Sequence, residues 1–388
     1  AGGGSVIINA TSIHINGSIN AIGKKSDYDP GAAGGTINLN TKTLTGNGSL
    51  NAKGGGGDYD LGGAGGRIAL YFNENSFTGN IIARGGSTSD EAGGAGTIYM
   101  KDKDKTYGNL TIDNEGWNGA DTPINSTFLS ENTINDLKVK GRSKVNLTRT
   151  LEIHNTKLNL SNGSMLWQNA NMTAPNLVNI TIPAGKGGMW QNEPFTATSL
   201  KNIADNGTLQ LTNSYEFHKP LSTLEVQSYG LLTHKANDAN HTYDINLTVE
   251  NLTIKQGGEI DVDGKGYSSQ EGPGAGISND GGGHGGDGGN NPDSAYGSIT
   301  NPTTLGSGGE EGPGAGAVII EANNTIIDGS IIADGKIEDQ YTGAGGSINL
   351  NTETLSGTGN ITANGGLSDW DDDTGAGGRI ALYFNENS

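Results

Sequence analysis

Short apolar segments recur along the first hundred residues with a period of about 31 residues. In each segment, apolar residues alternate with small or polar ones. One series begins at Ser5, Thr36, Arg67 and Thr97, where the chain reads SVII, TINL, RIAL and TIYM. A second series occupies residues 19–21, 50–52, 81–83 and 110–112. Alternation with period two predicts half-buried β-strands, and no stretch of useful length has helical spacing.

Each repeat of about 31 residues would form one rung, meaning one turn of a stacked β-structure. A single rung is too small to bury its own apolar face, whereas a stack of like rungs buries it in a continuous core. The expected fold is all-β: a parallel, right-handed β-helix or β-solenoid with glycine-rich loops and rungs about 4.8 Å apart. Equivalent residues of successive rungs are expected to stack in buried rows, here called files. One file is expected to contain Val6, Ile37, Ile68 and Ile98, and a second Ile8, Leu39, Leu70 and Met100. The small residues Ala21, Ala52 and Ala83 are expected at a tight corner.

A much longer repeat overlies the short one. Residues 66–76 return unchanged at 378–388, and residues 317–388 as a whole match residues 5–76. This predicts a tandem unit of about 312 residues, of which the chain is a window cut from a longer array. The expected regions are glycine-rich rungs at 1–107, a less regular β-solenoid at 108–263, a glycine-rich surface loop region at 264–316, and a second copy of the N-terminal rungs at 317–388. A separate β-sandwich at 108–262 is the alternative for the second region.

Composition narrows the possible partners. With 23 basic and 42 acidic residues, the formal net charge is −19, and there is no basic stripe of the kind that binds nucleic acid. The chain contains no cysteine, which excludes disulfides and cysteine metal sites. Its apolar runs are only a few residues long, so no membrane-spanning segment is expected.

The glycine-rich part of the chain contains a characteristic series of short motifs. They are GKGY at 264–267, GHGG at 283–286, YGS at 296–298, GSGG at 306–309 and AVII at 317–320. The series resembles the repeats of giant glycine-rich tandem-repeat β-helix surface and filament proteins of archaea and bacteria. The resemblance covers about 1–115 and 250–388. It implies β-helical architecture and an extracellular location at the cell surface. No catalytic residue carries over from it, because the group has no shared catalytic motif.

Acidic residues recur at the rung period, each group shortly before a glycine-alanine turn. Stacked carboxylates about 5 Å apart would repel by roughly 3 kcal/mol per pair at an effective dielectric near 20. Calcium, which accepts six to eight oxygen ligands in loose geometry, would offset that repulsion; a solvated acidic rim screened by salt is the alternative. If calcium binds, a chelator should lower the melting temperature; an unchanged melting temperature with no bound calcium would contradict the idea. The candidate ligands are Asp27, Asp29, Asp58, Asp60, Asp90, Glu91, Asp369 and Asp371.

Asn-x-Ser/Thr acceptor sequences are dense, and exposed ones would carry N-linked glycans if the source glycosylates asparagine. They occur at Asn9, Asn16, Asn47, Asn109, Asn125, Asn146, Asn159, Asn162, Asn171, Asn179, Asn206, Asn240, Asn246, Asn251, Asn323 and Asn360.

No other motif points to chemistry. The six histidines are scattered without metal-ligand spacing, although residues 282–287 resemble half of a calcium-binding nonapeptide. The chain has no G-x-S-x-G elbow, and its carboxylates repeat on every rung, unlike a unique active site. We therefore expect a non-enzymatic structural protein that forms a rod, filament or sheath by end-to-end or lateral self-association. The alternatives are an adhesin stalk and a β-helix polysaccharide lyase or hydrolase.

Overall fold

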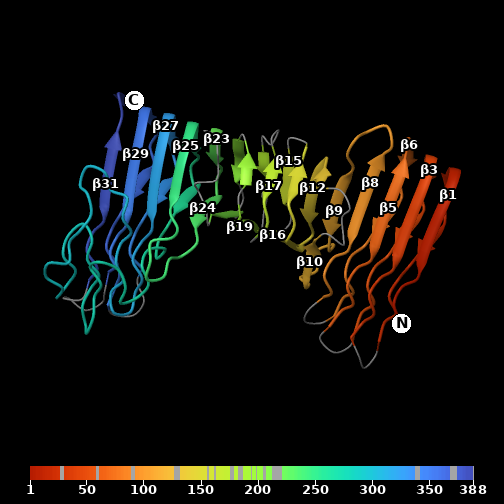
Figure 1. Cartoon of the computed structure of the whole chain (residues 1–388), viewed down its shortest axis with the longest axis horizontal. Helices are drawn as coiled ribbons and strands as arrows, with labels where there is room; N and C mark the ends of the chain where they lie inside the picture. Colours follow the sequence, from red (N-terminus) through yellow and green to blue (C-terminus); the bar gives the residue numbers. More distant parts are fainter. Residues whose placement is uncertain are drawn as a thin grey trace. The chain divides into compact units, whose positions relative to one another are not determined.

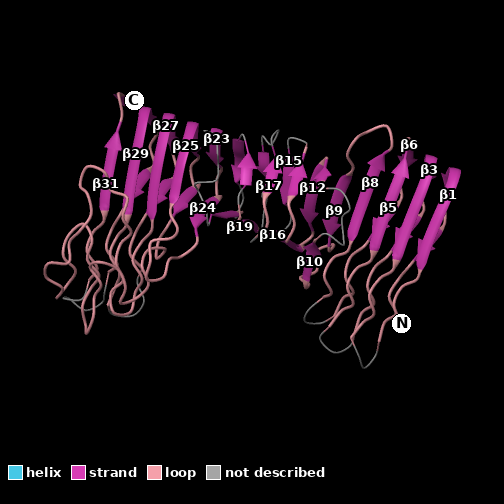
Figure 2. Ribbon diagram, viewed as in Figure 1, coloured by secondary structure: helices cyan, strands magenta, loops and turns pink. Residues whose placement is uncertain are grey.

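The computed structural model describes residues 1–26, 30–57, 61–88, 92–125, 132–154, 157–160, 163–174, 179–181, 187–193, 195–197, 199–203, 207–211, 221–336, 341–367 and 374–387. The chain forms two compact units, Ala1–Met189 and Trp190–Ser388. Every regular element in these ranges is a β-strand, and nearly all strand pairs are parallel (Figure 2). The expected all-β class with parallel sheets is thereby confirmed. Within the same ranges, no helix has the length and apolarity that a membrane crossing requires.

The main sheet of the N-terminal unit follows the rungs in chain order (Figure 1). Its strands are β1 (Ser5–His14), β3 (Thr36–Gly46), β5 (Arg67–Phe72), β8 (Thr97–Asp102), β9 (Asn109–Asp113), β12 (Asp136–Lys140), β15 (Lys157–Leu160) and β18 (Asn179–Thr181), with β6 (Glu74–Phe77) also paired to β3. Shorter strands form three further stacks: β2 (Ser18–Asn20), β4 (Ser49–Asn51) and β7 (Asn80–Ile82); β10 (Asp121–Ile124), β13 (Lys144–Leu147) and β16 (Met165–Gln168); β11 (Thr133–Ile134), β14 (Leu151–Ile153) and β17 (Met172–Ala174).

The registers of the first rungs confirm both predicted files. Ile37 pairs with Val6 on one side and with Ile68 on the other, and Ile68 pairs with Ile98. The second file runs in the same way through Ile8, Leu39, Leu70 and Met100. The inner members of both files are fully buried, and the small residues Ala21, Ala52 and Ala83 lie buried beside them in the same core. Like residues therefore stack over like residues from rung to rung, as the sequence period predicted.

The fourth member of the second sequence series was assigned wrongly. Residues 110–112 lie in β9, whereas the strands of the other three members, β2, β4 and β7, form their own stack. The chain turns back after β8, and β9 pairs with it antiparallel, with Tyr99 opposite Leu110. Directly opposed residues point to the same face of a sheet. Leu110 and Ile112 are therefore buried on the face opposite to that of Ile98, so the core changes sides of the sheet at this turn.

The C-terminal unit has a main parallel sheet of β21 (Ser199–Ile203), β23 (Leu221–Val226), β25 (Ile245–Ile254), β27 (Ala317–Ile327), β29 (Ser347–Ser356) and β31 (Arg379–Tyr383), with β32 (Glu386–Asn387) also on β29. A second stack contains β22 (Thr208–Leu211), β24 (Leu231–His234), β26 (Glu259–Asp261), β28 (Ser330–Ile332) and β30 (Asn360–Thr362). β20 (Phe195–Ala197) also belongs to this unit, and β19 (Gly188–Gln191) spans the boundary between the units.

Apolar pairs with alternating spacing between residues 137 and 262 lie in these strands or directly beside them and are buried. Examples are Leu137 with Val139 in β12 and Leu252 with Ile254 in β25. Residues 264–316, between β26 and β27, contain no strand. This glycine-rich segment is held by backbone and side-chain hydrogen bonds against the turns that precede β29 and β31.

Candidate functional site

The proposed calcium ligands cannot be placed. Asp27, Asp29, Asp58, Asp60, Asp90, Glu91, Asp369 and Asp371 all lie outside the described residues. Among the residues that are described, no three histidine, aspartate or glutamate side chains are grouped so that they could hold a metal ion. The calcium site therefore stays a prediction from the sequence.

The glycosylation candidates are spread over strands and turns of both units. Those with exposed side chains are Asn9, Asn16, Asn47, Asn109, Asn171, Asn240, Asn251, Asn323 and Asn360. Asn125, Asn146 and Asn246 are partly exposed; Asn159 and Asn179 lie in strands without described side chains; Asn162 and Asn206 fall outside the described residues. Several carboxamides bond along the stack, such as Asn324 Nδ2, which donates to Asn251 Oδ1 at 3.0 Å. The exposed positions are open to modification, and occupancy stays a prediction.

A polar arrangement of several side chains surrounds His284 in the glycine-rich segment. His284 is fully buried. Its Nδ1 lies 2.7 Å from the carbonyl oxygen of Gly345 and therefore carries the proton, which leaves Nε2 to accept from the Thr304 hydroxyl at 2.8 Å. Burial, with a smaller contribution from the Arg379 guanidinium, lowers the pKa of His284 to about 4, so the ring is neutral near pH 7.

Two neighbouring side chains complete this arrangement. The ring of Tyr296 lies 4.9 Å from that of His284, and its hydroxyl bonds the Leu305 carbonyl at 2.5 Å and the Ser307 hydroxyl at 2.8 Å. Burial raises the pKa of Tyr296, which keeps its hydroxyl protonated. Arg379, in β31, donates to the Tyr296 carbonyl at 2.8 Å and to the His284 carbonyl at 3.3 Å.

The bonds of this arrangement form a clasp between the glycine-rich segment and later rungs. Both ring nitrogens of His284 are engaged, and neither bonds a carboxylate of the described residues that could orient the ring as a general base. The bonds of His284 instead join the glycine-rich segment to rungs about 60 and 95 residues later in the chain. Sequence reasoning missed the partners of His284, because none lies at a spacing that local motifs use.

A second polar arrangement stacks two carboxylates on adjacent rungs. The Asp334 amide donates to Asp263 Oδ1 at 2.6 Å, and the Asn364 amide donates to Asp334 Oδ1 at 2.6 Å. Burial raises the pKa of Asp263 to about 7, with Asp261, Asp334 and Glu259 adding to the shift. Asp263 therefore holds its proton up to near-neutral pH, which relieves the repulsion within the stack.

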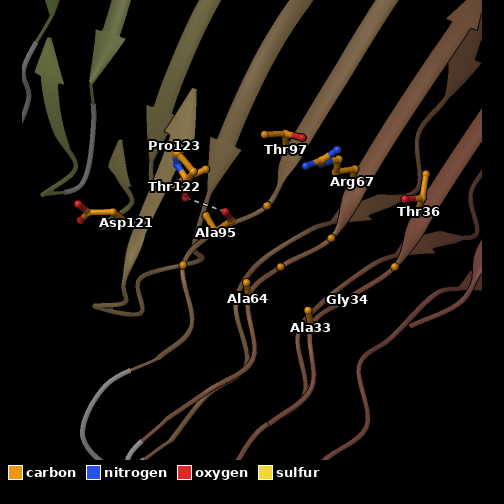
Figure 3. A pocket seen from close by; sticks show the side chains of 15 residues that line it. Ala33, Gly34, Thr36, Ala64, Arg67, Ala95, Thr97, Asp121, Thr122 and Pro123 are labelled. Atoms are coloured by element: carbon orange, nitrogen blue, oxygen red, sulfur yellow. Dashed lines mark hydrogen bonds between the residues drawn. The ribbon is translucent and has the colours of Figure 1, made fainter. Parts of the chain in front are cut away.

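The N-terminal unit contains an open pocket of about 340 Å³ (Figure 3). Its floor consists of glycine and alanine backbone from three successive turns, at 33–35, 64–66 and 94–96. Thr36, Arg67 and Thr97, the first residues of β3, β5 and β8, line one side, and residues 121–123 of β10 line another. Thr122 anchors β10 by donating its hydroxyl to the Ala95 carbonyl at 2.6 Å.

Comparison of the chain with protein-family models, with curated proteins and with solved structures finds no match.

Proposed function

We infer that the chain is part of a non-enzymatic structural protein, in which tandem units stack as a β-solenoid and form a rod, filament or sheath outside the cell. The observation that supports this most is the file of like residues in successive parallel strands, such as Ile37, Ile68 and Ile98. Such a stack has no natural end, because each rung leaves an edge on which another can pair.

The hydrogen bonding suits a load-bearing role. The turns between strands bond from rung to rung: the Gly3 amide donates to Ala33 at 2.8 Å, Gly34 to Ala64 at 2.8 Å and Gly65 to Gly94 at 2.9 Å. Strand ladders run in the same direction. Tension along the stack would therefore be shared over many parallel bonds rather than carried by one.

The repeated segment supports continuation of the stack. Ile37 and Leu39 pair with Ile68 and Leu70 in the N-terminal unit, and Ile348 and Leu350 pair with Ile380 and Leu382 in the C-terminal unit. The later segment stacks through β27 on β25, which belongs to the less regular region before it. A tandem array would use that same joint once in every unit.

Electron microscopy of chains with one and two tandem units tests the proposal. With about ten rungs per unit at about 4.8 Å each, every added unit should lengthen the particle by roughly 50 Å at constant width. Two separate compact particles on a flexible connection, or one globule of growing diameter, would contradict the proposal. A rod with a distinct knob at one end would favour an adhesin stalk instead.

A further inference from the structure

The two matching segments present the same outward face. Thr36, Asn38, Arg67 and Tyr71 of the N-terminal unit correspond in sequence to Ser347, Asn349, Arg379 and Tyr383 of the C-terminal unit. The glycine and alanine turns before these strands also match, with 33–35 reading AGG and 344–346 also reading AGG. Their backbone geometry agrees: Gly3 donates to Ala33 at 2.8 Å, and Ala315 donates to Ala344 at 2.9 Å.

In the C-terminal unit, residues 281–307 of the glycine-rich segment cover this face. On the backbone, Ala344 donates to Ser307 at 2.9 Å, Ala376 donates to Gly282 at 2.8 Å, and Gly285 donates to Gly377 at 2.9 Å. The cover buries Ala344 completely and leaves Ala376 only 7% exposed.

Side chains of the same face also bind the cover. The Ser347 hydroxyl donates to the Thr304 carbonyl at 2.6 Å, and the Asn349 amide group donates to Asn301 Oδ1 at 2.8 Å. The Tyr383 hydroxyl donates to the Thr300 carbonyl at 2.5 Å. Together with the His284 and Arg379 bonds, these contacts use every side chain of the repeated face named above.

In the N-terminal unit the counterparts of the two covered alanines are open. Ala33 and Ala64, which match Ala344 and Ala376, are both exposed. Among the described residues, their amides make no backbone hydrogen bond. Both residues line the 340 Å³ pocket, together with Thr36 and Arg67 (Figure 3). The two alanines are therefore buried where the glycine-rich segment covers them, and their counterparts line a pocket where no described segment does.

We propose that this pocket is the docking site for a glycine-rich segment with the chemistry of residues 281–307. The occupant places a histidine against the Gly34 carbonyl, accepts from the Thr36 hydroxyl, and offers backbone carbonyls to the Ala33 and Ala64 amides. The proposal deepens the proposed function and rests on it in one respect: a tandem array supplies such a segment ahead of every set of these rungs.

The occupant must be rich in glycine for a steric reason. A Cβ on Gly281 would lie 2.1 Å from the Thr374 carbonyl oxygen, and one on Gly285 would lie 2.3 Å from that of Gly378. Real Cβ atoms do not approach backbone so closely, so a side chain at either position would lift the segment off the rungs. The counterpart of Gly378 in sequence is Gly66, which also lines the pocket.

The test compares the 388-residue chain with a longer chain in which a copy of residues 264–316 is joined directly before Ser5. The protein has no cysteine, so Ala33→Cys provides a single reporter thiol at an exposed position. A maleimide reagent should label this thiol roughly tenfold more slowly, or slower still, in the longer chain. Hydrogen exchange at the Ala33 and Ala64 amides should slow by a similar factor. It is measured in chains without the cysteine, so it shows whether the Ala33→Cys substitution itself disturbs the pocket.

Variants of the added copy are the matched controls. Gly285→Val or His284→Ala, applied at the equivalent residue of the added copy alone, should restore fast labelling. Equal labelling rates in the short and long chains would overturn the proposal. Protection in the short chain that grows with protein concentration would also overturn it, because a second chain would then be the occupant.

The outcome is separable from that of the rod proposal. Particles that lengthen by about 50 Å per unit without any protection of Ala33 would contradict the docking proposal and support the rod proposal. Protection in chains that form no rods would do the reverse.

Discussion

Gly66→Ala is expected to destabilise the N-terminal unit by about 3 kcal/mol, near the upper end of the usual range for overpacking. A Cβ on Gly66 would lie 2.0 Å from the Gly35 carbonyl oxygen and 2.7 Å from the Gly34 carbonyl carbon on the preceding rung. Because both contacting atoms belong to the backbone, no side-chain rotation can relieve the clash. Hydrogen exchange of the β3 and β5 amides reports the loss in this unit alone.

Gly4→Ala is the matched control. Gly4 occupies the same position at the start of the first rung, and a Cβ there would meet nothing within 4 Å. The substitution should change the free energy of unfolding by less than about 0.5 kcal/mol. Similar losses for the two variants would show that the cost comes from the alanine itself rather than from the spacing between rungs.

His284→Ala is expected to release the glycine-rich segment, at a cost of about 3 kcal/mol. The substitution leaves the Gly345 carbonyl and the Thr304 hydroxyl without their partner and opens a cavity beside Tyr296. Hydrogen exchange of amides at 281–307 should speed up while that in the N-terminal unit stays the same. His14→Ala, at an exposed histidine, is the control and should leave exchange at 281–307 unchanged.

The same histidine should make stability depend on pH. The folded pKa of about 4 lies below the ordinary value of 6.5, so the unfolded chain binds a proton that the folded chain does not. The contribution of neutral His284 to the free energy of unfolding is fully present above pH 6.5. As the pH falls toward 4, the free energy of unfolding should decrease by roughly 3 kcal/mol. Buried His234, also with a pKa of about 4, adds a similar loss.

Denaturant melts of the C-terminal unit between about pH 7 and pH 4 measure this dependence. Asp263, whose pKa is raised to about 7, contributes over the same range with the opposite sign, so the test is the difference between the two chains: His284→Ala should lack the loss that His284 supplies and keep the contributions of His234 and Asp263. An unchanged dependence in that variant would contradict the burial of a neutral His284.

The period of the chain predicted the strands and files of the first hundred residues because each rung repeats one arrangement of apolar residues. Val6, Ile37, Ile68 and Ile98 could be aligned without a structure for that reason. The reversal after β8 could not be foreseen, since Leu110 to Ile112 have the alternation of the earlier rungs. Only the pairing partner distinguishes them, and sequence alternation does not encode it.

The clasp at His284 was hidden for a different reason. Its partners Gly345 and Arg379 lie in later rungs and are common residue types that belong to no motif. Arg67, identical in sequence context to Arg379, lines an open pocket instead. The role of such a residue depends on which segment lies over it, and that is determined by the fold.

The turn between β8 and β9 reverses two directions at once. The strands run the opposite way after it, and the core lies on the opposite face of the same sheet, while the order of strands continues unbroken. For a coil that advances in a given direction along its axis, two features together determine whether it is right- or left-handed: the direction in which its strands run and the side of the strands on which the core lies. Reversing one of them changes the handedness, and reversing both restores it. In the β-solenoid proposed above, the two reversals cancel, so the coil would keep one screw sense through the turn even though its axis moves across the sheet.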